Sequence, residues 1–206
     1  MKLLIVRHAQ SNGNASRDYS VATHDSLSSD GEEQAGSLAK ILTAFTFDKV
    51  VVSPLQRAME TLVPYLSATR QKAEIWPEIA EGCWQKEREG PSGSWTSQPD
   101  RLSSRFSPHF TFRNNVAIRP SDQETFGEGL CRVHETSGLL LEEANKKTGS
   151  LLMVAHGNFN RELLNHLLMT SEPLEFHHDN CGMTSLDFDG EWHLNFLNTA
   201  MTFRVC

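Results

Sequence analysis

The sequence has 206 residues, of which 38% are hydrophobic and 22% are charged, and its formal net charge is −7. A chain of this length can bury a substantial core, so we expect residues 1–206 to form one α/β domain with a modest insertion. The acidic balance, with no basic block to offset it, argues against nucleic acid or an anionic membrane surface as a partner.

Signals for export, membrane insertion and disulfide formation are weak. The apolar run at residues 3–6 is too short for a signal-peptide core, and no later run approaches the length of a membrane span. The four cysteines are scattered and include no CxxC pair, which favours reduced thiols over a disulfide framework or a zinc site. We therefore expect a cytoplasmic protein.

In chain order, short apolar runs alternate with helical patterns. Strands buried on both faces are predicted at residues 3–6, 50–52 and 151–155. Helices are predicted at about residues 30–45, 58–66, 124–147 and 159–167, the first beginning with a capping box of Asp30 and Glu33. This alternation indicates a parallel sheet that is covered on both faces.

The last part of the chain predicts a β-hairpin. Residues 186–188 and 192–196 alternate apolar and polar side chains around Asp189 and Gly190, as in two strands joined by a two-residue turn. A hairpin there would add an antiparallel edge to the parallel sheet. The fold class we expect is a three-layer α/β/α arrangement with a mostly parallel, mixed sheet.

Residues 83–121 interrupt this pattern. The segment is rich in Ser, Pro, Gly and aromatic residues, and its six basic and three acidic side chains give it a charge of +3. We interpret it as a small insertion over the active site rather than as a second domain.

Polar side chains follow each of the three apolar runs. Arg7 and His8 follow the first, Ser53 and Arg57 the second, and His156 the third. In open α/β sheets ligands bind beyond the carboxyl ends of the strands. Two arginines and two histidines converging there would bind a small, dense anion, because the guanidinium fork matches phosphate oxygens and helix N-termini add N–H donors. One such residue alone is usually solvated, so the joint occurrence carries the prediction.

Five segments, in order, resemble motifs of the histidine phosphatase superfamily, which has the phosphoglycerate mutase-like fold. RHAQSNGN at 7–14 resembles the R-H-G-x-[ST]-x-x-N signature, and LSSDGEEQA at 27–35 resembles L-[ST]-x-x-G-x-x-Q-A. SPLQRAMET at 53–61 is similar to S-P-L-x-R-A-x-x-T, and VAHG at 154–157, with Arg161, to V-x-H-G-x-x-x-R. Glu124, Arg132 and Val133 resemble a weaker E-[ST]…R-V helix.

The resemblance implies roles for these residues. His8 would be the nucleophile that forms a phosphohistidine, with Arg7, Arg57 and His156 around the transferring phosphoryl group. The substrate-binding residues it implies are Arg7, Asn14, Arg57, His156, Gly157 and Asn158. Phosphoryl transfer depends mainly on positioning and charge stabilisation, and a neutral imidazole is a competent nucleophile. Because side chains supply the positive charge, we expect no metal and no cofactor.

A general acid is also needed to protonate the leaving oxygen. The family places a Glu at the end of an L-x-E segment, so the resemblance implies Glu81, with Glu78 as the alternative. Two departures occur close to the site: Ala9 replaces the usual Gly, and GCWQ at 82–85 replaces G-x-W-E-G. These departures concern the pocket for the leaving group more than the pocket for the phosphoryl group.

Other motifs are weaker. No GxGxxG or GxxxxGK[ST] pattern occurs, which argues against dinucleotide and P-loop sites. His177 and His178 are adjacent and would point in opposite directions in a strand, so we interpret them as solvated loop residues rather than metal ligands.

Three functions follow from these observations. The leading hypothesis is a phosphatase that hydrolyses a small phosphomonoester, since Gln10 stands where mutases usually have Glu and no Phe-Thr-Gly-Trp-like segment follows Asn14. A phosphoglycerate-type phosphomutase is the alternative, supported by the positive charge of residues 83–121. A non-catalytic phospho-ligand binding protein is the third, against which His8, His156 and Glu81 argue. The expected partner is a small phosphorylated metabolite, and a homodimeric state stays open.

Overall fold

A computed structural model describes residues 1–17, 25–82, 104–113 and 124–200. In this part of the chain the strands form one sheet with the order β4-β3-β2-β5-β1-β6-β7. The strands are β1 (Lys2–Arg7), β2 (Lys49–Val52), β3 (Ala73–Ile75), β4 (Phe110–Phe112), β5 (Ser150–Ala155), β6 (Met183–Phe188) and β7 (Trp192–Thr199). Pairing is parallel from β4 to β1, whereas β6 is antiparallel to both β1 and β7.

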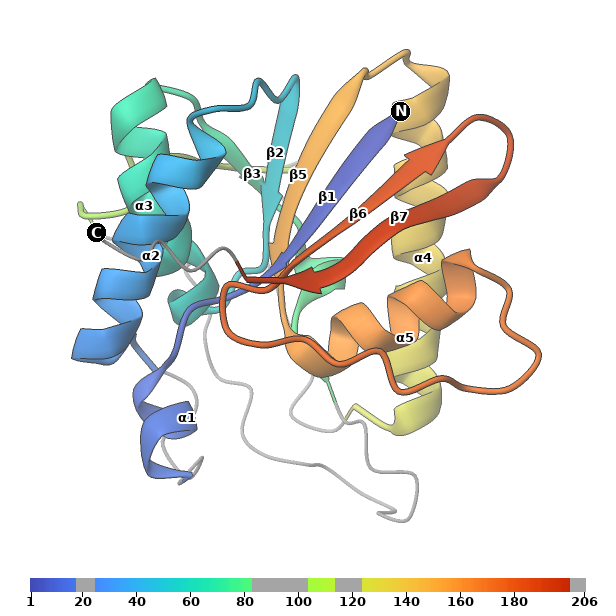
Figure 1. The fold of residues 1–206 in the computed structure, drawn as a ribbon, viewed down its shortest axis with the longest axis horizontal. Helices are drawn as coiled ribbons and strands as arrows, with labels where there is room; N and C mark the ends of the chain where they lie inside the picture. Colours follow the sequence, from blue (N-terminus) through green and yellow to red (C-terminus); the bar gives the residue numbers. More distant parts are fainter. Residues whose placement is uncertain (18–24, 83–103, 114–123, 201–206) are drawn as a thin grey trace.

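Helices cover both faces of this sheet. They are α1 (Asn12–Ser16), α2 (Ser29–Leu42), α3 (Gln56–Thr69), α4 (Phe126–Asn145) and α5 (Gly157–Leu167), with a 3-10 helix, η2, at Pro77–Ile79. Helices α2 and α3 lie on one face, and α4 and α5 lie on the other (Figure 1). The predicted three-layer fold with a mixed, mostly parallel sheet is confirmed. Among the described helices, none is both long enough and apolar enough to cross a membrane.

The apolar runs are buried because each faces two helical layers. In β2, Val50 and Val52 pack into the core under α2 and α3, whereas Val51 packs into the core under α4 and α5. None of these three side chains is more than 3% exposed. Burial on both faces explains why the strand shows no alternation of apolar and polar residues.

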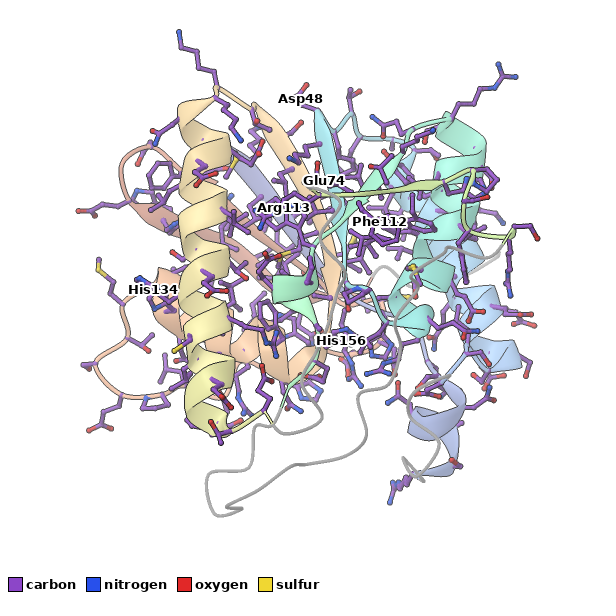
Figure 2. The ribbon with its side chains drawn as sticks, turned by 180° about the vertical axis from the view of Figure 1, so that it is seen from behind. Asp48, Glu74, Phe112, Arg113, His134 and His156 are labelled. Carbon is purple, nitrogen blue, oxygen red and sulfur yellow. The ribbon has the colours of Figure 1, made fainter. Side chains whose placement is uncertain are left out.

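The parallel strands share one carboxyl edge. Figure 2 labels Asp48, which precedes β2, and His156, which follows β5, at opposite ends of the sheet. The residues that follow β1, β2 and β5 therefore meet at the edge marked by His156.

Two local predictions need correction. Helix α2 is capped by Ser28, whose side chain accepts from the Gly31 N–H at 3.1 Å, and not by Asp30 with Glu33. Ser28 takes the extended backbone of an N-cap, so the helix already includes Asp30. The hairpin turn has three residues rather than two, because Phe188 pairs with Trp192. Its central glycine has a φ of 125°.

The described part of the predicted insertion contributes to the sheet. Residues 104–113 include β4, which pairs with β3 in parallel at the sheet edge. We had not predicted a strand there. Residues 83–103 and 114–121, on which the interpretation as an insertion over the site also depends, lie outside the described part.

Candidate active site

The carboxyl edge of the sheet brings the predicted strand-end residues together. Strand β1 leads into His8, β2 into Ser53, and β5 into His156, and backbone hydrogen bonds continue the parallel pairing as far as His8 and Ser53. The rings of His8 and His156 have centroids 5.0 Å apart. Two imidazoles separated by almost 150 positions in the chain therefore lie side by side.

The imidazole of His8 is buried and held at both nitrogens. Its Nδ1 lies 2.7 Å from the carbonyl oxygen of Ala9, which can only accept, so Nδ1 carries the proton. Nε2 therefore has a lone pair, and it accepts from Nε of Arg57 at 3.2 Å. The backbone of Ala9 is fixed in turn by a bond from its N–H to Thr61. Burial, and then the charges of Arg57 and Arg7, hold the pKa of His8 well below its ordinary value of 6.5.

His156 is fully buried at the N-cap of α5. Its Nε2 lies 2.7 Å from the hydroxyl of Ser53, and its Nδ1 has no hydrogen-bond partner within the described residues. Burial, followed by the charges of Arg57, His8 and Arg7, also holds the pKa of His156 well below its ordinary value. Both histidines are neutral at pH 7.

Arg7, the last residue of β1, lies close enough to His8 and His156 for its charge to act on both. Its Nη1 donates to the carbonyl oxygen of His178 at 2.7 Å, while its buried Nε has no hydrogen-bond partner in the described part of the chain. A Cβ at Gly157 would lie 3.3 Å from that Nε, so the absence of a side chain allows the start of α5 to pass close to Arg7. Asn158, the next residue of α5, is exposed.

The two candidate acids have different surroundings. Glu81 is half-buried, and its Oε1 accepts from the backbone N–H of Phe159 at 3.2 Å, in the first turn of the helix that His156 caps. Glu78 instead forms an ion pair of 2.5 Å with Arg113, the residue that follows β4 (Figure 2). The structure therefore brings Glu81, but not the side chain of Glu78, to the start of α5.

Asn14 is anchored by its amide oxygen. Its Oδ1 accepts from the N–H of Ser11, which completes the capping box of α1, and from Nδ2 of Asn180 at 3.2 Å. Nδ2 of Asn180 also donates to the carbonyl oxygen of His8 at 3.0 Å. Asn14 is thereby tied to the same backbone as His8.

Sequence reasoning missed two residues of the site. Asp25 is 5% exposed, accepts from the N–H of Gly13 and places Oδ2 3.7 Å from Nη1 of Arg57. Asn180 joins His8 to Asn14 as described above. Both lie in loops, and an isolated Asp or Asn in a loop has no sequence pattern that separates it from a solvated residue.

The interpretation of His178 as a solvated residue is wrong. His178 is 3% exposed rather than solvated, because Nδ1 donates to the carbonyl of Phe176 at 3.0 Å and Nε2 contacts Thr184. Burial lowers the pKa of His178 to about 4. In the described part of the chain, no group of three or more His, Cys, Asp or Glu side chains could hold a metal ion.

This arrangement suits a tetrahedral oxyanion. It offers a nucleophilic lone pair on His8, guanidinium groups from Arg7 and Arg57, and a buried imidazole nitrogen from His156 that lacks a partner among the described residues. Fixed positive charges in a site shielded from water are the main requirement for stabilising a transferring phosphoryl group. The fold and these side chains together define an α/β protein with a cluster of two arginines and two histidines at the carboxyl edge of its sheet.

The chain belongs to the histidine phosphatase superfamily (branch 1), whose family model matches residues 3–199. This confirms the predicted resemblance. The adenosylcobalamin/α-ribazole phosphatase of Escherichia coli (strain K12) is 34% identical over 88 residues, which are 41% of this chain and 43% of that protein. The matched stretch is thus less than half the length of that relative.

Solved structures match along nearly the whole chain. An α-ribazole phosphatase from Shigella flexneri is 24% identical, with a TM-score of 0.68 over 97% of this chain and 96% of its own. A mycobacterial glucosyl-3-phosphoglycerate phosphatase is 22% identical, with a TM-score of 0.66 over 97% of this chain and 99% of its own. At these identities the likeness establishes the fold.

Proposed function

We propose that this protein is a phosphatase that hydrolyses a small phosphomonoester through a phosphohistidine on His8. The observation that carries the proposal is the lone pair on Nε2 of His8, which accepts from Nε of Arg57 in a ring whose centroid lies 5.0 Å from that of His156. Membership of the histidine phosphatase superfamily supports it.

In the first step, Nε2 of His8 attacks phosphorus. The N–P bond forms as the bond from phosphorus to the ester oxygen breaks, and that oxygen takes a proton from Glu81. Arg7, Arg57 and His156 bind the three equatorial oxygens, on which charge is spread in the transition state. Asn14 and the backbone at Gly157 complete the oxyanion site, with Asn158 at its solvent side.

In the second step, water attacks the phosphohistidine. Glu81, now ionised, takes a proton from the water, the N–P bond breaks, and its electron pair returns to Nε2 of His8. Inorganic phosphate leaves, and the acid and the nucleophile are restored. The low pKa of His8 favours this cycle, since the free imidazole keeps its lone pair in mild acid.

Glu81 suits the acid/base role better than Glu78. Its carboxylate accepts from the N–H of Phe159 in the first turn of α5, the helix that His156 caps, whereas the carboxylate of Glu78 forms an ion pair with Arg113.

The substrate class is a small phosphomonoester. The similar proteins are named as phosphatases of α-ribazole phosphate and of glucosyl-3-phosphoglycerate, both small organic phosphates. We further infer a single-domain, cytoplasmic protein. This agrees with the free thiols of Cys131 and Cys181 in the described part of the chain and with burial that raises the pKa of Cys181 to about 12. A homodimer stays an open prediction.

The test is phosphate release from a panel of substrates. We expect turnover of p-nitrophenyl phosphate and of at least one compound among α-ribazole 5′-phosphate, glucosyl-3-phosphoglycerate and phosphoserine. A rapid quench should trap an acid-labile phosphoryl label on the protein, and both signals should be lost in His8→Ala. Isomerisation of 3-phosphoglycerate faster than phosphate appears would instead identify a mutase. A folded protein that is inactive on every ester would identify a binding protein.

A further inference from the structure

The guanidinium of Arg132, on α4, connects three parts of the molecule. Nη1 donates to the backbone carbonyls of Glu78 at 2.6 Å and Ala80 at 2.8 Å. The other edge of the guanidinium forms a two-pronged ion pair with Glu124, through Nε and, at 2.7 Å, through Nη2. Arg132 also lies over the ring of Phe159, 5.9 Å from its centroid.

These contacts hold the backbone on which Glu81 is carried. Ala80 directly precedes Glu81, and Glu78 belongs to η2, a single 3-10 turn with few backbone hydrogen bonds of its own. Such a short segment has little intrinsic stability, and its buried carbonyls need donors from elsewhere. Arg132 supplies both donors from a helix whose own position is fixed by the core.

Arg132 also holds the segment that carries Glu81 next to α5. Oε1 of Glu81 bonds to the N–H of Phe159, and the guanidinium of Arg132 lies over the ring of that same residue. Arg132 therefore fixes the distance between the carboxylate and the helix that His156 caps. Its charge is paired with Glu124, and among the causes that lower the pKa of His156 it is the smallest.

We propose that Arg132 is a positioning residue that holds Glu81 where it protonates the leaving oxygen, an inference that rests on the proposed function. Lysine cannot replace it, because a single ammonium group does not reach two carbonyls and pair with a carboxylate through a planar fork. Glu124 acts with it by orienting the guanidinium. Neither residue touches the transferring phosphoryl group.

The test compares leaving groups. An alkyl phosphate needs a proton on its departing oxygen, whereas p-nitrophenolate leaves with little help. We expect Arg132→Met and Arg132→Lys to lower kcat/KM for the alkyl ester about 100-fold and for the aryl ester less than about threefold, since general acid catalysis contributes about that much. In a Glu81→Gln background, Arg132→Met should cause no further loss, because both changes remove the same step.

Controls separate positioning from folding. Arg113→Met removes a neighbouring guanidinium that pairs with Glu78, and it should leave the alkyl-to-aryl ratio at the wild-type value. Glu124→Gln keeps the guanidinium but loosens it, and it should lower the ratio about tenfold even if Arg132→Met does not fold. Equal losses of kcat/KM on both esters would overturn the proposed role of Arg132, and so would a loss in the Glu81→Gln background as large as in the wild type. Neither result would overturn the proposed function. A wild-type protein inactive on both esters would overturn the proposed function as well.

Discussion

Neighbouring groups decide which nitrogen of each buried imidazole carries the proton. For His8, the carbonyl of Ala9 fixes the proton on Nδ1. For His156, we expect the hydroxyl of Ser53, which accepts from the N–H of Leu55 at 3.3 Å, to donate its own proton to Nε2, 2.7 Å away. A neutral His156 then carries its proton on Nδ1, the nitrogen without a partner among the described residues. His8 therefore presents a lone pair on Nε2, and His156 presents an N–H donor on Nδ1.

This assignment makes Ser53 a residue to test. In Ser53→Ala, Nε2 of His156 loses its partner, and the ring is no longer held in the tautomer that donates from Nδ1. We expect kcat/KM to fall about tenfold or more, the size of effect that follows when a buried polar group is left unsatisfied. The measurement is steady-state kinetics on p-nitrophenyl phosphate, with the affinity for inorganic phosphate as a second readout.

Ser150→Ala is the matched control. Ser150 begins β5, the strand that ends before His156, and its hydroxyl bonds to the carbonyl of Thr46 at the opposite edge of the sheet. Its loss should lower stability slightly and leave kcat/KM unchanged. Equal kinetics for the two variants would show that the hydroxyl of Ser53 does not set the state of His156.

At the scale of elements, the start of α2 braces the loop that follows His8. The carbonyl of Gln10 accepts from the N–H of Ser28, and the N–H of Gln10 donates to the side chain of Gln34 at 2.9 Å. A Cβ added at Gly31 would overlap the carbonyl oxygen of Gln10, so only glycine permits this approach. The helix thus fixes a backbone position two residues beyond the nucleophile proposed here.

Two glycines of α2 should therefore respond in opposite ways to alanine. Gly31→Ala should lower the free energy of unfolding by about 1–3 kcal/mol and reduce kcat/KM, because it pushes Gln10 away. Gly36→Ala, where no atom lies within 4 Å of the added Cβ, should raise the free energy of unfolding by about 0.5–1 kcal/mol without changing kcat/KM. Denaturant titration and kinetics on both variants test this pair, and a Gly31→Ala protein as stable and active as wild type would contradict it.

Sequence patterns predicted the strands and helices in which apolar residues recur at regular spacing or form a continuous run. The buried runs in β1, β2 and β5 and the helices α2 to α5 follow from apolar spacing, and the strand-end rule placed Arg7, His8, Arg57 and His156 together. Strands β3 and β4 and helix α1 were not predicted, because three-residue strands and a five-residue helix are too short to display a period. Within the site, Asp25 and Asn180 act from loops through two contacts each, and such contacts leave no periodic pattern in the sequence.

At the scale of the whole molecule, burial keeps His8, His156 and His178 neutral in the folded protein. His8 and His156 have pKa values held well below 6.5, mainly by burial, and the pKa of His178 is lowered to about 4. In the unfolded chain each returns to about 6.5. As the pH falls below 6.5, the unfolded chain therefore takes up protons that the folded protein does not bind.

The free energy of unfolding should consequently be greatest above pH 6.5 and should decrease as the pH falls from 6.5 toward 4. Each histidine contributes up to about 1.4 kcal/mol per pH unit while the unfolded chain is protonated at that imidazole and the folded protein is not. Denaturant midpoints at pH 7, 6 and 5 measure the slope. His178→Gln should reduce the slope, because it removes an imidazole whose pKa is lowered to about 4 in the folded protein. A stability that does not change between pH 7 and 5 would mean that these imidazoles are not held neutral by the fold, and the lone pair on which the proposed chemistry of His8 depends would lose its physical basis.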